Sequence, residues 1–281
     1  HRDSDLAEWI DKNCTFPNSM VDCIVPRTGK IEINIVKNLG IDDAVPVSHE
    51  NFRQWVIEDK FCAGRPSWEN VGAQFSDNVH GYEDQKIRIL NGGHQIVANA
   101  AELLGIETIR DAMKNPLITG LLEKVEQNEI LPHVSPVLGL TPQDYFKLIC
   151  NRFANPSIQD TIRRVAFDGS SRHAVFLVPS IQDGVAKNIS TNGLALVEAL
   201  WARMCEGSRE DGSVVEPNDP VWAKLNKIAI EAKDNPILWL EQKEIYESLS
   251  DSYLFAESFT FWLNELYLNG VQKSIQKYLD E

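Results

Sequence analysis

The chain has 281 residues, of which 43% are hydrophobic, so it can bury a substantial core as one large domain or as two modest ones. Its 27 basic and 41 acidic residues give a net charge of −14, which disfavours binding to nucleic acid or to an anionic membrane surface. No apolar run approaches the roughly 18 residues that a membrane span needs.

The five cysteines are odd in number and scattered, with no Cys-x-x-Cys among them. This pattern indicates reduced intracellular thiols and neither a disulfide framework nor a zinc site. The chain opens on His1, without an initiator Met and without a signal peptide, and reads like the middle of a longer protein. We therefore expect a cytoplasmic protein.

Strand signals are few and lie near the start of the chain. Isoleucines alternate with polar residues over 31–36, which is typical of a strand, and Val45-Pro46-Val47 is a candidate short edge strand. Beyond them, an Ala- and Leu-rich helix is predicted over 98–104, ending at Gly105.

The second half of the chain carries mainly helical patterns. Thr141-Pro142 predicts a helix start through Phe153, and Asn155-Pro156 predicts another toward Val165. Asp219-Pro220 begins a third run, and the stretch 253–268 is strongly helical before Asn269-Gly270. These patterns together predict a mainly α domain with minor β elements.

Several common functional motifs do not occur. No Gly-x-Gly-x-x-Gly follows a strand and no phosphate-binding Gly-x-x-x-x-Gly-Lys-Ser/Thr appears, so the chain cannot form a dinucleotide-binding βαβ unit of the usual kind. The six histidines show no His-x-x-x-His pairing or other metal-ligand spacing. A Gly-x-Ser-x-Gly motif is also missing, which argues against an α/β-hydrolase.

One short segment, from Lys86 to His94, places an amine, a carboxamide and an imidazole close together. On an α-helix, Asn91 would lie about 140° and His94 about 80° from Lys86, so all three side chains could reach one cleft. The adjacent Gly92 and Gly93 suggest a close approach to the backbone. The combination suits proton transfer at a hydroxyl or carbonyl carbon. The spacing alone nevertheless favours a solvated lysine, a capping asparagine and a hydrogen-bonded structural histidine.

Further motifs on both sides of this segment change that balance. They are Phe16-Pro-Asn-Ser-Met-Val-Asp22, Gln54-Trp-Val-Ile-Glu-Asp59, Phe61-Cys-Ala-Gly-Arg-Pro-Ser-Trp68, Asn155-Pro-Ser-Ile-Gln-Asp-Thr161 and Asp168-Gly-Ser-Ser171. In this order they resemble the long-chain polyol dehydrogenases, the mannitol dehydrogenase family. That family includes mannitol 2-dehydrogenase, arabinitol 4-dehydrogenase and the fructuronate, tagaturonate and mannonate oxidoreductases.

The resemblance runs over nearly the whole chain and carries a prediction of fold. It implies that residues 1–281 form the multi-helical C-terminal substrate domain of that family, of the 6-phosphogluconate dehydrogenase C-terminal-like type with minor β elements. The N-terminal Rossmann domain would then lie outside this chain. Related chains are helical over 31–36, so we expect a helix there despite the alternation.

The resemblance also implies roles for three catalytic residues. Lys86 would act as the general base that takes the alcohol proton, and would return it during ketone reduction, without zinc. Its amine must then be deprotonated near neutral pH, which requires desolvation or a nearby cation. Asn91 would donate a hydrogen bond to the developing alkoxide. His94 would bind the reacting hydroxyl and hold the Lys86 amine.

Three substrate-binding positions follow from the same resemblance. Asp22 would face substrate near the domain junction, or would simply tie down a loop. Arg164 matches the substrate-binding arginine of the family, with Arg163 as the residue most easily confused with it. Arg172 stands where the family usually has lysine, and Cys23 where it has arginine. The first exchange keeps the charge but changes its reach and donor geometry.

We therefore predict the substrate domain of an NAD(P)-dependent, zinc-independent polyol 2-dehydrogenase of the mannitol type, inactive as an isolated fragment. NAD or NADP would be bound mainly by the missing Rossmann domain, and Gly92 and Gly93 would leave space for substrate and nicotinamide. Two alternatives stay open: a uronate or aldonate oxidoreductase, in which Arg172 would help to bind a carboxylate, and a non-catalytic helical interaction module.

Overall fold

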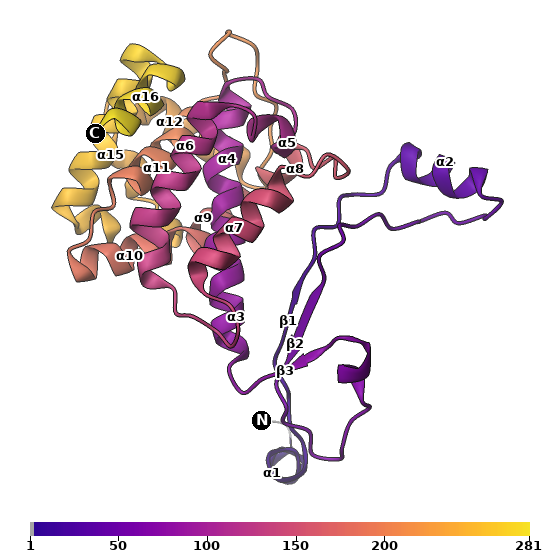
Figure 1. Cartoon of the computed structure of the whole chain (residues 1–281). Coiled ribbons are helices and arrows are strands. Elements are labelled where there is room, and N and C mark those ends of the chain that lie inside the picture. Colours follow the sequence, from indigo (N-terminus) through magenta and orange to yellow (C-terminus); the bar gives the residue numbers. More distant parts are fainter. Residues whose placement is uncertain (1–2) are drawn as a thin grey trace. The chain divides into compact units, whose positions relative to one another are not determined.

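The computed structural model describes residues 3–281 and divides the chain into two compact units (Figure 1). The first unit ends at Asp84 and the second begins at Gln85. Among the described residues, no helix combines the length and the apolar character needed to cross a membrane.

The first unit is built around a small sheet. Its elements are α1 (Ser4–Asn13), β1 (Ser19–Asp22), α2 (Lys30–Asn38), β2 (Gln54–Ile57), the 3₁₀-helix η1 (Trp68–Val71), β3 (Gln74–Phe75) and most of α3 (Val79–Gln85). The sheet has the order β1-β2-β3, with β1 antiparallel and β3 parallel to β2. Val56 on the central strand is completely buried and lies opposite Met20 of β1.

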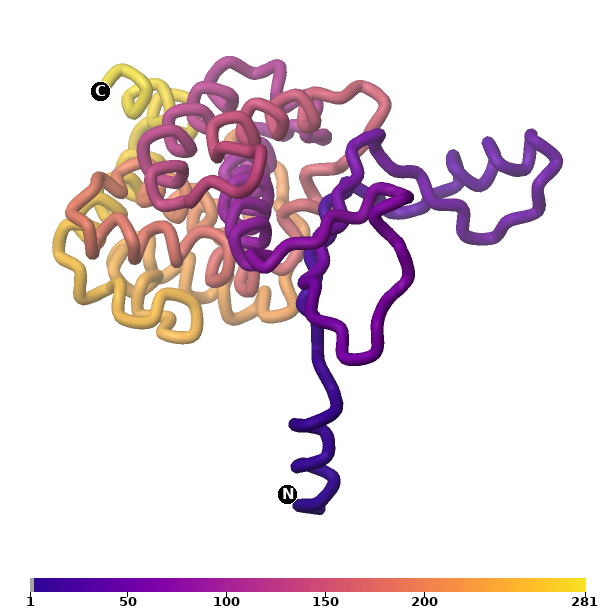
Figure 2. Tube along the Cα trace, turned by 60° about the horizontal axis from the view of Figure 1, so that its bottom comes forward, coloured from indigo at the N-terminus to yellow at the C-terminus, as the bar shows by residue number. Residues whose placement is uncertain are grey.

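The two helices of this unit stand away from its sheet, at opposite ends (Figures 1 and 2). Neither α1 nor α2 contains a buried residue. The expected helix over 31–36 is confirmed, and Glu32 caps it by accepting a hydrogen bond from the backbone N–H of Gly29 at 2.8 Å. The expected strand at 45–47 is wrong, because this segment pairs with no neighbouring strand and both valines are exposed.

The second unit is helical. Its elements are η2 (Lys86–Asn91), α4 (Gly92–Leu103), α5 (Ile109–Ala112), α6 (Pro116–Val125), η3 (Glu126–Ile130), η4 (Leu131–His133), α7 (Pro142–Phe153), α8 (Ile162–Val165), α9 (Gly169–Phe176), α10 (Val178–Lys187), α11 (Asn192–Cys205), α12 (Trp222–Ala232), α13 (Ile237–Leu240), α14 (Lys243–Tyr246), η5 (Leu249–Asp251), α15 (Tyr253–Asn269) and α16 (Val271–Asp280). Of the η elements here, η2 and η3 are π-helices.

Two buried helices form the centre of this unit. Every residue of α4 is buried, as are nearly all residues of α11, and the two helices pack against each other. A helix that is buried on every side must be covered by neighbouring elements all round. Accordingly, α6, α8 and α9 also contact α4, while α11 lies between α4 and α15 (Figure 1).

Most predicted helix boundaries in this unit are confirmed. Helix α7 begins at Pro142, and the Thr141 hydroxyl caps it by accepting from the N–H of Asp144 at 3.1 Å. The helix predicted to start at Asn155-Pro156 is wrong. The Asn155 side chain instead accepts a hydrogen bond from the N–H of Ser157 at 3.0 Å, which stabilises a turn. The helix then begins only at Ile162, after the Thr161 cap.

Candidate active site

The segment from Lys86 to Asn91 is a π-helix that leads directly into α4. Its signature is the backbone N–H of Gly92, which donates to the carbonyl of Ile87, five residues earlier. Residues five apart lie about one turn apart in this geometry, so Asn91 stands over Lys86 instead of about 140° away from it as on an α-helix. His94 follows Asn91 by three residues, which keeps it on the same face. By helix geometry, the three predicted catalytic residues therefore fall on one helical face.

The imidazole of His94 is buried between aromatic and cationic groups. It stacks on the ring of Phe153 from α7, with ring centroids 4.2 Å apart, and its Nε2 has no hydrogen-bond partner. Burial lowers the pKa of His94 well below its usual value, and the charges of Arg164, Arg152 and Arg172 lower it further. His94 is thus a neutral imidazole whose buried Nε2 has no protein partner.

Of the two adjacent arginines in α8, only Arg164 acts on His94. Arg164 holds Asp160 with both ends of its guanidinium, and the Nε–Oδ1 distance is 2.5 Å. Arg163 instead contacts the Glu102 carboxylate at 3.4 Å and donates to the carbonyl of Glu216 at 2.8 Å. Arg163 therefore belongs to a separate ion-pair cluster.

Arg172 extends the positive charge beside His94. It lies on α9, is partly buried, and donates from Nη1 to the carbonyl of Val165 at 2.8 Å. Burial lowers the pKa of Arg172, and the neighbouring charge of Arg164 lowers it further. The guanidinium groups of these two residues are close enough to repel each other, so anionic or hydroxyl-rich ligands are favoured here.

Arg152 was not among the residues predicted from the sequence and is the third cation near His94. It is only 6% exposed, on α7 next to the ring that His94 stacks on. A signal was available in the sequence, because Tyr145, Ile149 and Arg152 follow helical spacing and the first two are core residues. An arginine in line with an apolar face indicates a buried charge with a specific use.

The two glycines before His94 do not have the predicted role. A Cβ at Gly92 would stand 3.3 Å from Leu177 Cδ2, and a Cβ at Gly93 would stand 3.2 Å from Glu126 Oε1. The space beside them is therefore filled by neighbouring protein groups. The expectation that these glycines leave space for substrate and nicotinamide is wrong, since they allow close helix packing instead.

Asp22 belongs to the first unit, whereas the other five predicted site residues belong to the second. It ends β1, opposite Gln54 of β2, and is 1% exposed. Its burial agrees both with a substrate contact and with a structural role, so its function remains a prediction.

Within residues 3–281, no group of three or more His, Cys, Asp or Glu side chains lies close enough to hold a metal ion. The basic side chains around His94 are also poor ligands for a cation.

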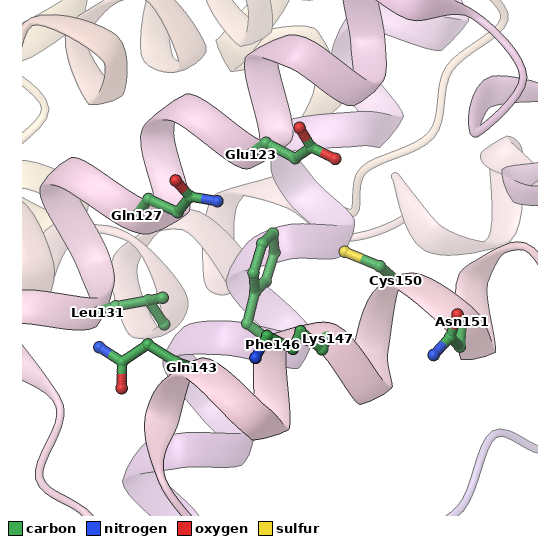
Figure 3. Close-up of a pocket in the computed structure, with 8 residues that line it drawn as sticks. All are labelled: Glu123, Gln127, Leu131, Gln143, Phe146, Lys147, Cys150 and Asn151. Atoms are coloured by element: carbon green, nitrogen blue, oxygen red, sulfur yellow. The ribbon is translucent and has the colours of Figure 1, made fainter.

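A separate groove of about 720 Å³ lies between the α6–η3 segment and α7 (Figure 3). Phe146 and Cys150 line it from α7, while Glu123 and Gln127 face them from the opposite helix. Burial, helped by the negative charge of Glu123, raises the pKa of the Cys150 thiol to about 11. Cys150 is therefore a neutral thiol near pH 7 and not a reactive nucleophile.

The chain matches two known family models. The sequence model of the mannitol dehydrogenase C-terminal domain matches residues 78–267, about two thirds of the chain. The chain belongs to the mannitol dehydrogenase family. The mannitol dehydrogenase Rossmann domain matches residues 1–70, so part of that domain is in this chain, and the prediction that it lies wholly outside is wrong. The predicted family and the mainly α fold are confirmed.

Individual relatives are similar over almost the entire chain. It is 46% identical over 277 residues to mannitol 2-dehydrogenase of Cereibacter sphaeroides, covering 99% of this chain and 58% of that protein. It is 32% identical over 284 residues to mannitol 2-dehydrogenase of Aspergillus terreus, covering 99% and 57%. The chain thus spans a little over half the length of these relatives.

Solved structures show the same fold. The ternary complex of Pseudomonas fluorescens mannitol 2-dehydrogenase with NAD and D-mannitol matches with a TM-score of 0.91 and 35% identity, over 99% of this chain and 57% of that one. The substrate-free form of D-sorbitol dehydrogenase matches with a TM-score of 0.87 and 30% identity, over 98% and 57%.

Proposed function

We propose that this chain is the substrate-binding and catalytic part of an NAD(P)-dependent polyol 2-dehydrogenase that interconverts a secondary alcohol and a ketose. The observation that carries the proposal is the neutral, buried His94, whose Nε2 has no protein partner and which shares a helical face with Lys86 and Asn91. A structural relative that binds NAD and D-mannitol, and several mannitol 2-dehydrogenases among the sequence relatives, support the mannitol-type substrate.

Each of the three residues has a distinct task at the reacting carbon. The Lys86 amine takes the proton of the alcohol during oxidation and returns it to the carbonyl oxygen during reduction. The Asn91 amide donates a hydrogen bond to that oxygen as negative charge develops on it. The neutral imidazole of His94 hydrogen-bonds the same hydroxyl and fixes its direction toward Lys86. This assignment requires no zinc.

The polyol itself would be held by the arginines near His94. Arg164 and Arg172 come from different helices, and their guanidinium groups can each donate to several hydroxyl oxygens. Asp160 fixes Arg164 from one side, which orients its remaining N–H groups. Asp22, in the first unit, stays a predicted substrate-binding residue.

The residues of this chain do not by themselves fit a dinucleotide. The sequence has no glycine fingerprint, and β1 and β2 of its only sheet within residues 3–281 run antiparallel instead of forming a βαβ unit. NAD or NADP would be held mainly by the remainder of the Rossmann domain. When bound, its nicotinamide supplies the hydride acceptor or donor.

That remainder would also cover the first unit. Helices α1 and α2 have no buried residues, and Leu6, Trp9, Ile31 and Ile35 are each more than half exposed. Exposed apolar groups in such number mark a surface made for contact with protein. Since residues 1–70 match part of the Rossmann domain, we assign that contact to the rest of the same domain.

A uronate or aldonate oxidoreductase is the second candidate. The observation in its favour is the set of three arginines whose charges reach His94, since a carboxylate binds well among guanidinium groups. A non-catalytic interaction module is the third, and would leave the Lys86 and His94 arrangement unused.

A substrate panel with the full-length protein distinguishes these candidates. Oxidation of mannitol, arabinitol and mannonate would be assayed with NAD and NADP, and reduction of fructose and fructuronate with NADH and NADPH. Each assay would be run with and without EDTA. We expect turnover of mannitol and fructose that EDTA does not reduce. A preference for the carboxylated substrates would favour the second candidate, turnover abolished by EDTA would refute zinc independence, and no turnover would favour the interaction module.

A further inference from the structure

Glu126 is a fully buried acid that the mechanism above does not use. It begins η3, is 0% exposed, and neither of its carboxyl oxygens has a hydrogen-bond partner. Burial raises the pKa of Glu126 well above its usual value and so favours the neutral carboxylic acid. Nearly all buried polar groups in proteins are hydrogen-bonded, and an exception calls for a specific reason.

The carboxyl group of Glu126 lies against the residue that precedes His94. Its Oε1 is 3.2 Å from the position that a Cβ of Gly93 would occupy. Leu122 Cδ1 and Phe153 Cε2 lie 3.4 and 3.6 Å from the same point. The acid, the leucine and the edge of the phenylalanine ring thus converge on one backbone position of α4.

The same ring is the stacking partner of His94. Phe153 and the imidazole are nearly parallel, with an interplanar angle of 21°. His94 is therefore fixed from two directions: by the backbone of Gly93 and by the ring of Phe153. Glu126 lies at the point where these two supports meet.

The setting of Glu126 resembles that of Lys86. Each residue begins a π-helical stretch, η3 and η2 respectively, and these two stretches pack against each other. π-Helical turns are rare and occur frequently at functional sites. Glu126 thus lies in a segment that packs against the segment of Lys86 and Asn91.

We propose that Glu126 is a positioning residue for His94, and that its flat carboxyl group is matched in shape to the bare backbone of Gly93. The pair fixes where His94 presents Nε2 to the reacting hydroxyl. This inference rests on the proposed function. On this proposal, position 93 must be glycine because a side chain there would meet the carboxyl group of Glu126, and not because the substrate needs the space.

A double-mutant cycle in the full-length protein tests the pairing. Gly93→Ala places a methyl group against Oε1 and displaces the segment that carries His94, so we expect KM for the polyol to rise about tenfold. Glu126→Ala removes the obstacle, so Gly93→Ala/Glu126→Ala should have a KM within about twofold of Glu126→Ala alone. Loss of folded enzyme lowers apparent kcat but does not raise KM. Independent, multiplicative effects of the two changes on KM would overturn the proposal.

Two variants of Glu126 test whether the shape of its side chain matters for the contact with Gly93. Glu126→Gln keeps the flat, neutral shape and should leave KM within about twofold of wild type, whereas the branched side chain of Glu126→Leu should raise it about tenfold. The control is Glu123→Ala, one turn earlier and facing the groove of Figure 3, which should change nothing. Equal KM values for the Gln and Leu variants would contradict the shape-matching role, and this comparison remains valid if Gly93→Ala does not fold.

A spectroscopic readout separates this inference from the proposed function. The ring resonance of His94 in histidine-labelled full-length protein should shift in Gly93→Ala and return in the double variant, whether or not any polyol is turned over. An unchanged resonance in Gly93→Ala would overturn the positioning role, while the substrate panel above tests the activity by itself.

Discussion

The imidazole of His94 stacks on the ring of Phe153, which comes from α7, far along the chain from α4. This contact determines the plane of the histidine ring, and burial in the same place keeps the ring neutral. A side chain that must point one nitrogen at a substrate hydroxyl gains its direction from such stacking.

Replacing Phe153 with leucine should therefore impair substrate binding more than stability. We expect KM for the polyol to rise about tenfold, since small misplacements of site groups have large effects, and the free energy of unfolding to fall by about 1–2 kcal/mol. Phe146→Leu is the matched control, because Phe146 lies on the same helix and is also buried. It should lose similar stability without a change in KM. Equal KM values for the two variants would refute the role of the stacking.

Lys86→Ala should abolish most of the proton transfer. We expect kcat in the full-length protein to fall by about 10²–10⁴-fold, the usual contribution of a general base, while NAD(H) affinity stays nearly unchanged. Steady-state kinetics and cofactor titration measure the two quantities. The control is Lys147→Ala, an exposed lysine on α7. Normal turnover in Lys86→Ala would remove Lys86 from the mechanism.

The chain by itself should bind no NAD(H). Its residues contain no dinucleotide fingerprint, and only part of the Rossmann domain is present. Isothermal titration calorimetry of the 281-residue chain, with the full-length protein as the positive control, measures this directly. Tight binding by the chain alone would show that the nucleotide site is misplaced.

Glu129 should make stability depend on pH. Its carboxyl oxygens accept the N–H groups of Gly193 and Leu194 at 2.7 and 2.8 Å, at the start of α11, and Tyr278 contacts one of them. Burial nevertheless dominates and raises the pKa of Glu129 from 4.5 to about 7.

The sign of the effect follows from proton binding. Between about pH 4.5 and pH 7 the folded state holds a proton on Glu129 that the unfolded state has released. Stability is therefore greatest below this window and falls through it as the pH rises, by at most about 3 kcal/mol. Urea unfolding at pH 5 and pH 7.5 should show a smaller fall in Glu129→Gln than in wild type. Glu123→Gln, an exposed control, should behave like wild type. An equal fall in all three proteins would exclude Glu129 as the source.

The sequence by itself determined the family, the mainly α fold and the helix boundaries marked by strong local signals. Thr141-Pro142 and Asn269-Gly270 are such signals, because a capping hydroxyl and a glycine with positive φ act within a few residues of the chain. Through the motifs that carry the family resemblance, it also identified Lys86, Asn91 and His94 as candidates, which their spacing alone did not favour.

Only the tertiary structure decided how that segment is used. The π-helical turn over 86–91 depends on packing around α4 and has no local sequence signal, yet it moves Asn91 over Lys86. The third cation, Arg152, and the partner of Gly93, Glu126, approach from helices distant in sequence. Local patterns describe what a residue can do, whereas burial and contacts between helices determine which neighbours it meets.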